Sequence, residues 1–170
     1  CNLIYEINKN INKNYIKFYE IIIIDDFSTD KTQKVIEKFI KKNDVRYFRN
    51  SYNAGQSYSI HKGIKLASYQ HIVTIDGDGQ NNPTNINDLV KCLIENKQFD
   101  LIGGIRFKRQ DSFFKIFASK IANFVRSSIL NDNCVDTGCS LKIFNKKIFL
   151  NLPYFNSMHR FLPALFKGFG

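Results

Sequence analysis

The sequence contains no tryptophan, one methionine, three prolines and nine glycines among its 170 residues. So little proline and glycine excludes a collagen-like or low-complexity chain. The hydrophobic content of 44%, with 16 phenylalanines, excludes wholesale disorder. A chain of this length buries roughly 70% of its unfolded surface, which is enough for a stable hydrophobic core without disulfides or metal ions. We therefore expect one folded domain over residues 1–170.

Long hydrophobic runs are also missing. The longest unbroken aliphatic run is Ile21 to Ile24, whereas a membrane-spanning helix needs about 20 apolar residues. Asn and Lys interrupt the first apolar residues, so no secretory signal is visible. The only methionine is Met158, and we expect the chain to be a fragment of a longer coding sequence, truncated at both ends.

Cysteine is scarce, and its spacing excludes a structural zinc site. We expect reduced thiols at all four positions, which are Cys1, Cys92, Cys134 and Cys139.

Acidic residues are too few to balance the basic ones, so the net charge is +10. Basic chains often bind phosphate groups, but the abundance of Lys, Asn and Ile also fits AT-rich coding. Only six of the 25 basic residues are Arg. Since clustered arginines and interleaved stacking aromatics are absent, we expect no nucleic-acid partner.

Strand-like and helix-like segments alternate along the chain. β-Branched and apolar runs predict strands at residues 20–25, 45–48, 71–75 and 101–105. Helical periodicity and helix-start residues predict helices at residues 3–18, 28–42, 55–68, 83–96 and 112–130. This order predicts a three-layer α/β/α fold with a mostly parallel central sheet. In such sheets, ligands bind beyond the carboxyl ends of the strands.

The sharpest chemical signal follows the predicted strand at 71–75. Asp76 and Asp78 can turn toward one cation, and Gly77 lets the backbone bend between them. Mg²⁺ and Mn²⁺ prefer carboxylate oxygens together with substrate phosphate. An Asp-x-Asp pair also occurs by chance in turns, but its place after a buried strand and before Gln80 favours a metal site.

Two other strand ends carry charged groups. Asp25 and Asp26 can accept hydrogen bonds from a nucleobase or a ribose, or one residue of this segment can simply cap the next helix. Arg106 and Arg109 follow the strand at 101–105, and guanidinium groups bind phosphate in a bidentate manner. Exposed arginines are also common after strands, yet arginine is rare in this chain.

Six segments, in order along the chain, resemble motifs of family 2 glycosyltransferases with the GT-A fold, in the dolichyl- and polyprenyl-phosphate branch. Residues 25–30 are similar to Asp-Asp-Gly-Ser-x-Asp, 53–55 to Asn-x-Gly, 76–83 to Asp-x-Asp-x-Gln-x-x-Pro, 106–112 to Arg-x-x-Arg, 136–142 to Asp-x-Gly-Cys-x-Leu-Lys, and 159–165 to His-Arg-Phe-x-Pro-Ala-Leu. The resemblance covers nearly the whole chain, but Phe27 stands where the family has Gly. The family's opening strand, its downstream basic segment and its membrane helices have no counterpart in these 170 residues.

The resemblance implies an inverting, metal-dependent transfer of a sugar from a nucleoside-diphosphate sugar to a polyprenyl phosphate, at the cytoplasmic face of the membrane. It implies these roles: Asp25, Asp26, Asn53, Gly55 and Asp76 at the nucleotide; Asp76, Asp78 and Gln80 at Mg²⁺ or Mn²⁺; Arg106, Arg109 and Arg160 at the acceptor phosphate; and Asp78, Arg106, Arg109 and Asp136 in catalysis. Asp136 would orient the acceptor or act as an optional base, or it would only cap a turn.

Two rival functions stay open at this point. A transferase of the same fold acting on a sugar hydroxyl would depend strictly on one carboxylate as a base. A receiver-like, Mg²⁺-binding signalling module would use an acidic pair and a later Asp, but it would need neither the Asp-x-Asp-x-Gln nor the Arg-x-x-Arg pattern.

Overall fold

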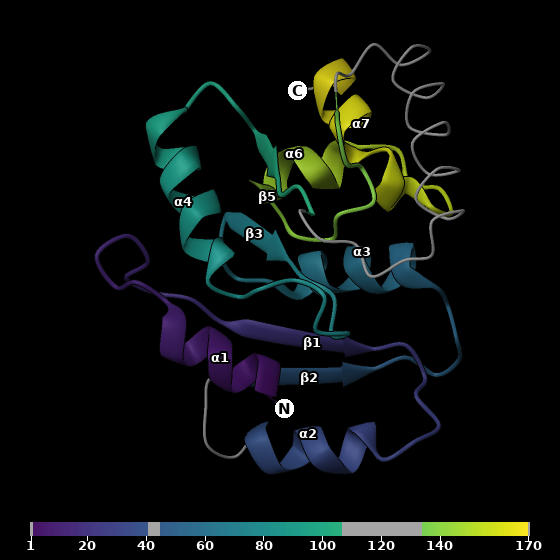
Figure 1. Cartoon of the computed structure of the whole chain (residues 1–170). Helices are drawn as coiled ribbons and strands as arrows, with labels where there is room; N and C mark the ends of the chain where they lie inside the picture. The colour runs from purple at the N-terminus through teal and green to yellow at the C-terminus, as the bar shows by residue number, and fades with distance from the viewer. Residues whose placement is uncertain (1, 41–44, 107–133, 170) are drawn as a thin grey trace, which may run out of the picture.

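The computed structural model describes residues 2–40, 45–106 and 134–169 (Figure 1). Its helices are α1 (Asn2–Asn10), α2 (Thr32–Ile40), α3 (Gln56–Leu66), α4 (Asn85–Glu95), α6 (Lys146–Asn151), the short 3-10 helix η1 (Met158–Arg160) and α7 (Leu162–Phe169). Its strands are β1 (Ile21–Asp25), β2 (Val45–Arg49), β3 (His71–Thr74), β4 (Leu101–Gly103) and β5 (Lys142–Asn145). The predicted helix at 112–130 and Arg109 lie outside the described residues.

The strands form two groups that are not hydrogen-bonded to each other within the described part of the chain. β1 and β2 pair in parallel, whereas β5 lies between β3 and β4 and is antiparallel to both. The α/β class is as predicted, and β5 is the one described strand that runs against its neighbours. β3 and β4 run in the same direction and β5 lies reversed between them, although the sequence pattern did not predict a strand at β5.

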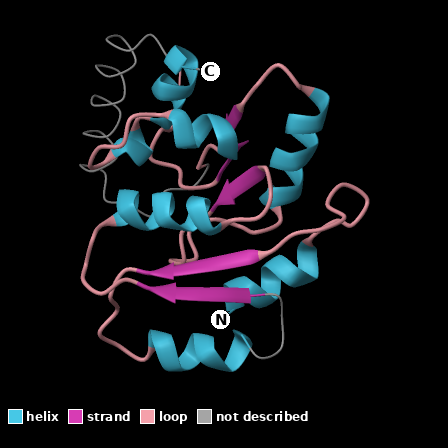
Figure 2. Ribbon diagram, turned by 180° about the vertical axis from the view of Figure 1, so that it is seen from behind, coloured by secondary structure: helices cyan, strands magenta, loops and turns pink. Residues whose placement is uncertain are grey.

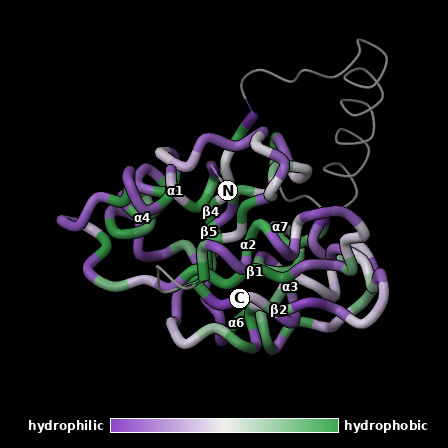
Figure 3. Tube along the Cα trace, turned by 90° about the horizontal axis from the view of Figure 1, so that it is seen from below, coloured by the Kyte–Doolittle hydropathy of each residue, from purple (hydrophilic) through white to green (hydrophobic). Residues whose placement is uncertain are grey.

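β5 divides the hydrophobic interior into two clusters, because successive side chains of a strand point to opposite faces. Phe144 packs with residues of α3, α6, η1 and α7, while its neighbour Ile143 packs with residues of α1 and α4. Helices therefore cover both faces of the sheet, as Figure 2 shows from behind. In Figure 3 the hydrophobic stretches gather toward the middle of the molecule. The three-layer arrangement is the predicted one.

The helix expected at 3–18 ends early, at Asn10. Asparagine side chains here replace helical hydrogen bonds, which explains the early end. The Asn12 side chain accepts a hydrogen bond from the amide of Asn14 at 3.0 Å, and Asn87 of α4 bonds the backbone of both Asn10 and Asn12. These bonds attach the loop after α1 to α4.

Candidate active site

The carboxylate that ends β1 is buried and fully engaged. Asp25 accepts hydrogen bonds from the Ser28 amide at 2.8 Å and the Tyr47 hydroxyl at 2.6 Å, and Arg49 lies 3.7 Å away. Burial would raise the pKa of Asp25, but these hydrogen bonds and the Arg49 charge outweigh it and lower the pKa. Burial, together with the hydrogen bond to the Asp25 carboxylate and its negative charge, raises the pKa of Tyr47 to about 12, although the Arg49 charge opposes this shift. Asp25 is thus an ionised group that holds the turn after β1.

Asp26 holds a second loop in place. Its carboxylate accepts hydrogen bonds from the amides of Ala54 and Gly55, both at 2.8 Å, and from the Asn50 side chain at 2.7 Å. Burial would raise the pKa of Asp26, but these bonds outweigh it and lower the pKa. Gly55 has a φ of 87°, a conformation that glycine adopts without strain. Asn53 is exposed, and its side chain makes no hydrogen bond with the described residues.

The loop after β3 carries the acidic pair. Asp76 accepts a hydrogen bond from the Gln56 side chain, at the start of α3, at 2.9 Å. Asp78 is exposed and accepts from the backbone amide of Gln80 at 3.0 Å, which closes a small turn. The residue in the left-handed region is Gly79, with φ 76°, and Gly77 is not in that region. The chain does turn at Gly77 and Asp78, and Gly79 continues the bend in the left-handed region.

Ser140 ties this loop to β5. Its hydroxyl accepts hydrogen bonds from the Asp76 amide at 3.1 Å and the Asn81 side chain at 2.9 Å. The Ser140 carbonyl also accepts from the Thr74 hydroxyl at 2.7 Å. Ser140 therefore fixes where β3 ends and where the acidic loop begins.

Arg106 and Asp136 form a bidentate ion pair. The Arg106 Nε and Nη2 atoms donate to the two carboxylate oxygens of Asp136 at 2.9 and 2.8 Å. The Asp136 side chain is 4% exposed and that of Arg106 is 23% exposed. Gly138 allows this approach, because a Cβ atom there would lie 2.7 Å from Arg106 Nη2. Two of the residues that the resemblance assigns to the acceptor side are thus joined to each other.

A buried lysine, Lys142, stabilises the turn at 136–139. The Lys142 amine donates to the backbone carbonyls of Thr137 and Cys139. Burial lowers the pKa of Lys142, although nearby acidic groups, including Asp136, oppose that shift. The turn at 136–139 is therefore held by both Arg106 and Lys142.

The segment with Arg160 is anchored through its neighbour. His159 Nδ1 lies 2.7 Å from the hydroxyl of buried Ser57 on α3. Burial and the charges of Arg160 and Lys142 lower the pKa of His159, and Asp76 opposes this. Arg160 itself is exposed at the end of η1.

Hydrogen bonds connect these groups into one edge of the fold. Asp26 binds Gly55, Gln56 follows and binds Asp76, and Ser140 joins Asp76 to the turn that holds Arg106. The residues after β1, β3 and β4 therefore meet, as the charged strand ends had predicted.

The acidic loop suits a hard divalent cation. Asp78 and Gln80 are exposed side chains with oxygen ligands, and the second oxygen of Asp78 accepts no hydrogen bond from the described residues. No cluster of three or more His, Cys, Asp or Glu residues able to hold a metal exists in the described ranges. Two or three protein ligands fit Mg²⁺, which usually completes its shell with phosphate and water.

Several residues that build the site were not predicted from the sequence. Asn50, Gln56, Ser57, Ser140 and Lys142 hold the predicted residues through hydrogen bonds. Position after a strand could have pointed to Asn50, which directly follows β2. The roles of the other four residues depend on contacts between segments that are distant in the sequence, and the spacing of residues along the chain does not predict such contacts.

A family model, described as glycosyl transferase family 2, matches residues 2–152. The chain belongs to this family. Curated relatives include a dodecaprenyl-phosphate galacturonate synthase from Rhizobium johnstonii, 35% identical over 158 residues, which cover 91% of this chain and 46% of that protein. An undecaprenyl-phosphate 4-deoxy-4-formamido-L-arabinose transferase from Proteus mirabilis is 32% identical, over 89% of this chain and 46% of that protein. The chain thus spans about half the length of these relatives.

Solved structures give the same fold. A crystal structure of S. aureus TarS, residues 1–349, matches with a TM-score of 0.55 and 17% identity, over 96% of this chain and 52% of that one. A second crystal structure of TarS, in complex with UDP, matches equally well at 18% identity, over 96% of this chain and 51% of that one. The family 2 chain therefore has the α/β fold of GT-A glycosyltransferases.

Proposed function

We propose that this chain is the catalytic domain, within a longer protein, of an enzyme that transfers a sugar from a nucleoside-diphosphate sugar to a polyprenyl phosphate. The observation that carries the proposal is the hydrogen-bonded edge where the acidic loop and the Arg106–Asp136 pair meet. The names of the two relatives described above include a polyprenyl phosphate. The similar fold of TarS has been solved in complex with UDP. We place the enzyme at the cytoplasmic face of the membrane.

On the donor side, Asp78 and Gln80, with Asp76, would hold Mg²⁺ or Mn²⁺ beside the diphosphate. Such an ion would neutralise the charge that develops on the leaving diphosphate. The internal hydrogen bonds of Asp25 and Asp26 favour an indirect role for them: they shape the nucleotide pocket by holding the turn at 27–30 and the loop at 53–55.

On the acceptor side, cationic groups would orient the phosphate of the lipid. A phosphate monoester has a second pKa near 6, so it is mostly ionised at neutral pH and scarcely needs a base. The bidentate pair supports a role for Asp136 in positioning the guanidinium of Arg106. Arg160 is exposed on η1 and would contribute from the neighbouring segment, with Arg109 as a third candidate.

A single substitution on the donor side tests the proposal in the full-length protein. Asp78→Ala should abolish metal-dependent binding of nucleoside diphosphate, measured by calorimetry, because it removes an exposed ligand without touching the core. Asp88→Ala, an exposed aspartate on α4, is the matched control and should bind normally. Unchanged binding by Asp78→Ala would show that the metal assignment is wrong.

The hydroxyl-acceptor alternative rests on Asp136, a buried carboxylate on the acceptor side of the site. A base must be available to take a proton, and both oxygens of Asp136 accept from Arg106. The pair therefore favours the phosphate acceptor. Transfer to a sugar hydroxyl but not to undecaprenyl phosphate, by the purified full-length enzyme, would favour the alternative.

A further inference from the structure

His159 joins the segment that carries Arg160 to the start of α3. Its Nδ1 atom lies 2.7 Å from the hydroxyl of Ser57, which is buried. Gln56, the residue before Ser57, donates a hydrogen bond to Asp76 at 2.9 Å. His159 therefore lies next to the edge where the acidic loop begins, although the motif resemblance assigns it no role.

The backbone on both sides of His159 is fixed by the hydrophobic core. Met158 and Leu162 are buried in the cluster that also contains Phe144. Ser157, directly before η1, has a φ of 67° in the left-handed region, where a residue with a Cβ atom is uncommon. Such a conformation persists only where the surrounding packing enforces it. The His159 side chain is therefore presented by a rigid segment.

The bonding of Ser57 assigns the proton on the His159 ring. A buried hydroxyl uses its proton in a hydrogen bond, and His159 Nδ1 is the partner of the Ser57 hydroxyl within the described residues. Ser57 therefore donates and Nδ1 accepts, which places the ring proton of a neutral histidine on Nε2. Burial and the charges of Arg160 and Lys142 lower the pKa of His159 and so favour the neutral ring, although Asp76 opposes this.

The Nε2 atom of His159 is then a donor that needs an acceptor. Within the ranges that the structure describes, Nε2 makes no hydrogen bond. Because Nδ1 faces Ser57 on α3, Nε2 points away from that helix. The charges that act on the ring come from Arg160, Lys142 and Asp76, which belong to the acceptor side and to the acidic loop. A substrate bound at this edge would therefore meet Nε2 with an acceptor oxygen.

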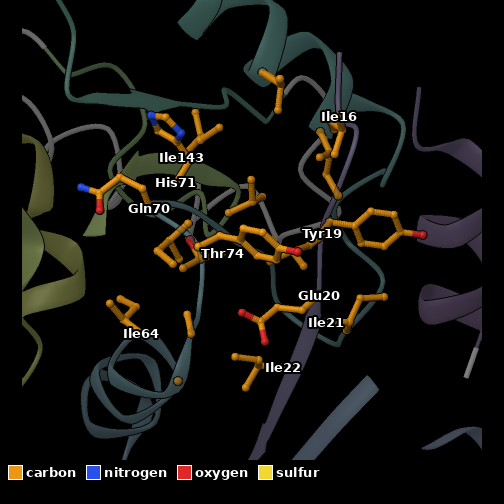
Figure 4. Close-up of a pocket in the computed structure, with 18 of the residues that line it drawn as sticks. Ile16, Tyr19, Glu20, Ile21, Ile22, Ile64, Gln70, His71, Thr74 and Ile143 are labelled. Atoms are coloured by element: carbon orange, nitrogen blue, oxygen red, sulfur yellow. The ribbon is translucent and has the colours of Figure 1, made fainter. Parts of the chain in front are cut away.

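The interior of the large cavity between β1 and β3 is a poor place for a phosphate. Its volume is about 1060 Å³, and Gln56, Asp76 and Ser140 line it where it reaches the hydrogen-bonded edge. Among the apolar side chains that line it further in, Figure 4 labels Ile21, Ile22, Ile64 and Ile143. A charged group is costly in such surroundings. We therefore expect phosphate at the edge, where Gln56 adjoins Ser57 and His159.

We propose that His159 binds the substrate through Nε2, which donates a hydrogen bond to a phosphate oxygen, while Ser57 holds the ring in place through Nδ1. His159 is then a substrate-binding residue and Ser57 a positioning residue. A hydrogen bond to a charged oxygen is stronger than one between neutral groups. The inference rests on the proposed function, because the phosphate belongs either to the nucleoside diphosphate or to the polyprenyl phosphate.

Two substitutions in the full-length enzyme separate the two ring nitrogens. The amide nitrogen of His159→Gln can take the place of Nε2, whereas the shorter amide of His159→Asn reaches only the place of Nδ1 and can still bond Ser57. Calorimetry with UDP and with GDP, each with Mg²⁺, measures donor binding, and calorimetry with undecaprenyl phosphate in detergent measures acceptor binding. For one of these ligands, the Asn variant should bind roughly tenfold to a hundredfold more weakly, as expected for a lost hydrogen bond to a charged group. The Gln variant should retain most of the affinity.

The reverse order, with binding kept by the Asn variant and lost by the Gln variant, would show that His159 only anchors η1 to α3 and would overturn the proposal. Equal affinities of the two variants for every ligand would overturn it as well. His71→Asn, at the exposed start of β3, is the control and should bind normally. Thermal melting shows whether each variant folds.

A measurement on the wild-type protein does not depend on the variants. With ¹⁵N in the histidine rings, NMR should show the proton of His159 on Nε2, and the Nε2 resonance should move more than that of Nδ1 when the phosphate ligand is added. A proton on Nδ1, or an Nε2 resonance that no ligand moves, would overturn the proposal even if neither variant folds.

Failure of the proposed function would give a different result. A wild-type enzyme that binds a nucleoside diphosphate but not undecaprenyl phosphate would contradict the polyprenyl-phosphate acceptor, and nucleotide binding would still test His159. A loss confined to the nucleotides assigns the phosphate to the donor, and a loss confined to undecaprenyl phosphate assigns it to the acceptor. Binding of neither ligand by the wild type would overturn both proposals.

Discussion

Phe27 is a residue whose backbone conflicts with its side chain. Its φ of 68° lies in the left-handed region, which costs a residue with a Cβ atom about 1–2 kcal/mol. This is the position where the resembling motif has Gly. The guanidinium of Arg49 lies 4.9 Å from the Phe27 ring, and a cation–π contact at an exposed site contributes about 0.5–1 kcal/mol. The contact thus offsets part of the strain.

Comparing Phe27→Gly with Phe27→Val isolates the backbone strain, because both variants lose the contact with Arg49. Glycine fits the left-handed turn, whereas a β-branched residue does not. We expect the glycine variant to be more stable by about 1 kcal/mol, after allowing for the greater unfolded-state entropy of glycine. Urea denaturation measures this, and equal stability of the two variants would contradict a strained turn.

The pair of Arg106 and Asp136 should behave as a unit in catalysis. In the full-length enzyme, Arg106→Lys keeps the charge but loses the planar fork, and a lost charge-assisted hydrogen bond costs about 1.5–3 kcal/mol. We therefore expect transfer to undecaprenyl phosphate to fall by roughly tenfold to a hundredfold. The double variant with Asp136→Asn should be no slower than the slower single variant, since both remove the same contact.

Arg46→Lys is the control for this series, because Arg46 pairs with Glu20 through Nη1 at the opposite end of β1. It should transfer normally. Additive losses for Arg106→Lys and Asp136→Asn, or normal transfer by Arg106→Lys, would contradict the role of the pair.

At the scale of elements, Asp26 joins the end of β1 to the start of α3. Its pKa is below the ordinary value of 3.8 in the folded protein. The stabilisation by its ionised form is therefore complete above pH 3.8 and is lost as the pH falls through the folded pKa. Acid should loosen the connection between β1 and the loop at 53–55.

Asp26→Asn tests this connection. We expect a loss of about 1–3 kcal/mol in the free energy of unfolding at pH 7, and a smaller difference from the wild type at pH 3. Urea denaturation at both pH values is the measurement. Asp88→Asn on α4 should differ little at either pH, and a loss for Asp26→Asn that does not depend on pH would contradict the assignment.

The elements also show what sequence could and could not predict. The isoleucine run of β1 and the carboxylates after β1 and β3 were correctly predicted, because local composition decides both. β5 was missed, since Ile143 and Phe144 are a short apolar pair whose strand state depends on β3 and β4. The Arg106–Asp136 pair was also beyond prediction, as 30 residues separate its partners.

On the scale of the whole molecule, the net charge of +10 gives a testable link to the membrane. No helix in the described ranges is long and apolar enough to cross a bilayer. We expect the chain to sediment with vesicles containing phosphatidylglycerol and not with pure phosphatidylcholine vesicles. Raising the salt from 0.1 M to 1 M shortens the Debye length from about 10 Å to about 3 Å, so binding should be lost. Binding that does not depend on salt would contradict an electrostatic attachment of the chain to the membrane surface.

The position of β5 has a consequence for how the chain folds. Both hydrophobic clusters need β5, which follows its partner β3 by more than 60 residues in the chain. Contacts between distant segments form slowly, because loop closure precedes the gain from packing. A nascent chain therefore exposes two unfinished apolar surfaces on the ribosome until the segment around Phe144 has emerged. We expect docking of β5 to be a late folding step, and the emerging chain to be a substrate for chaperones during that interval.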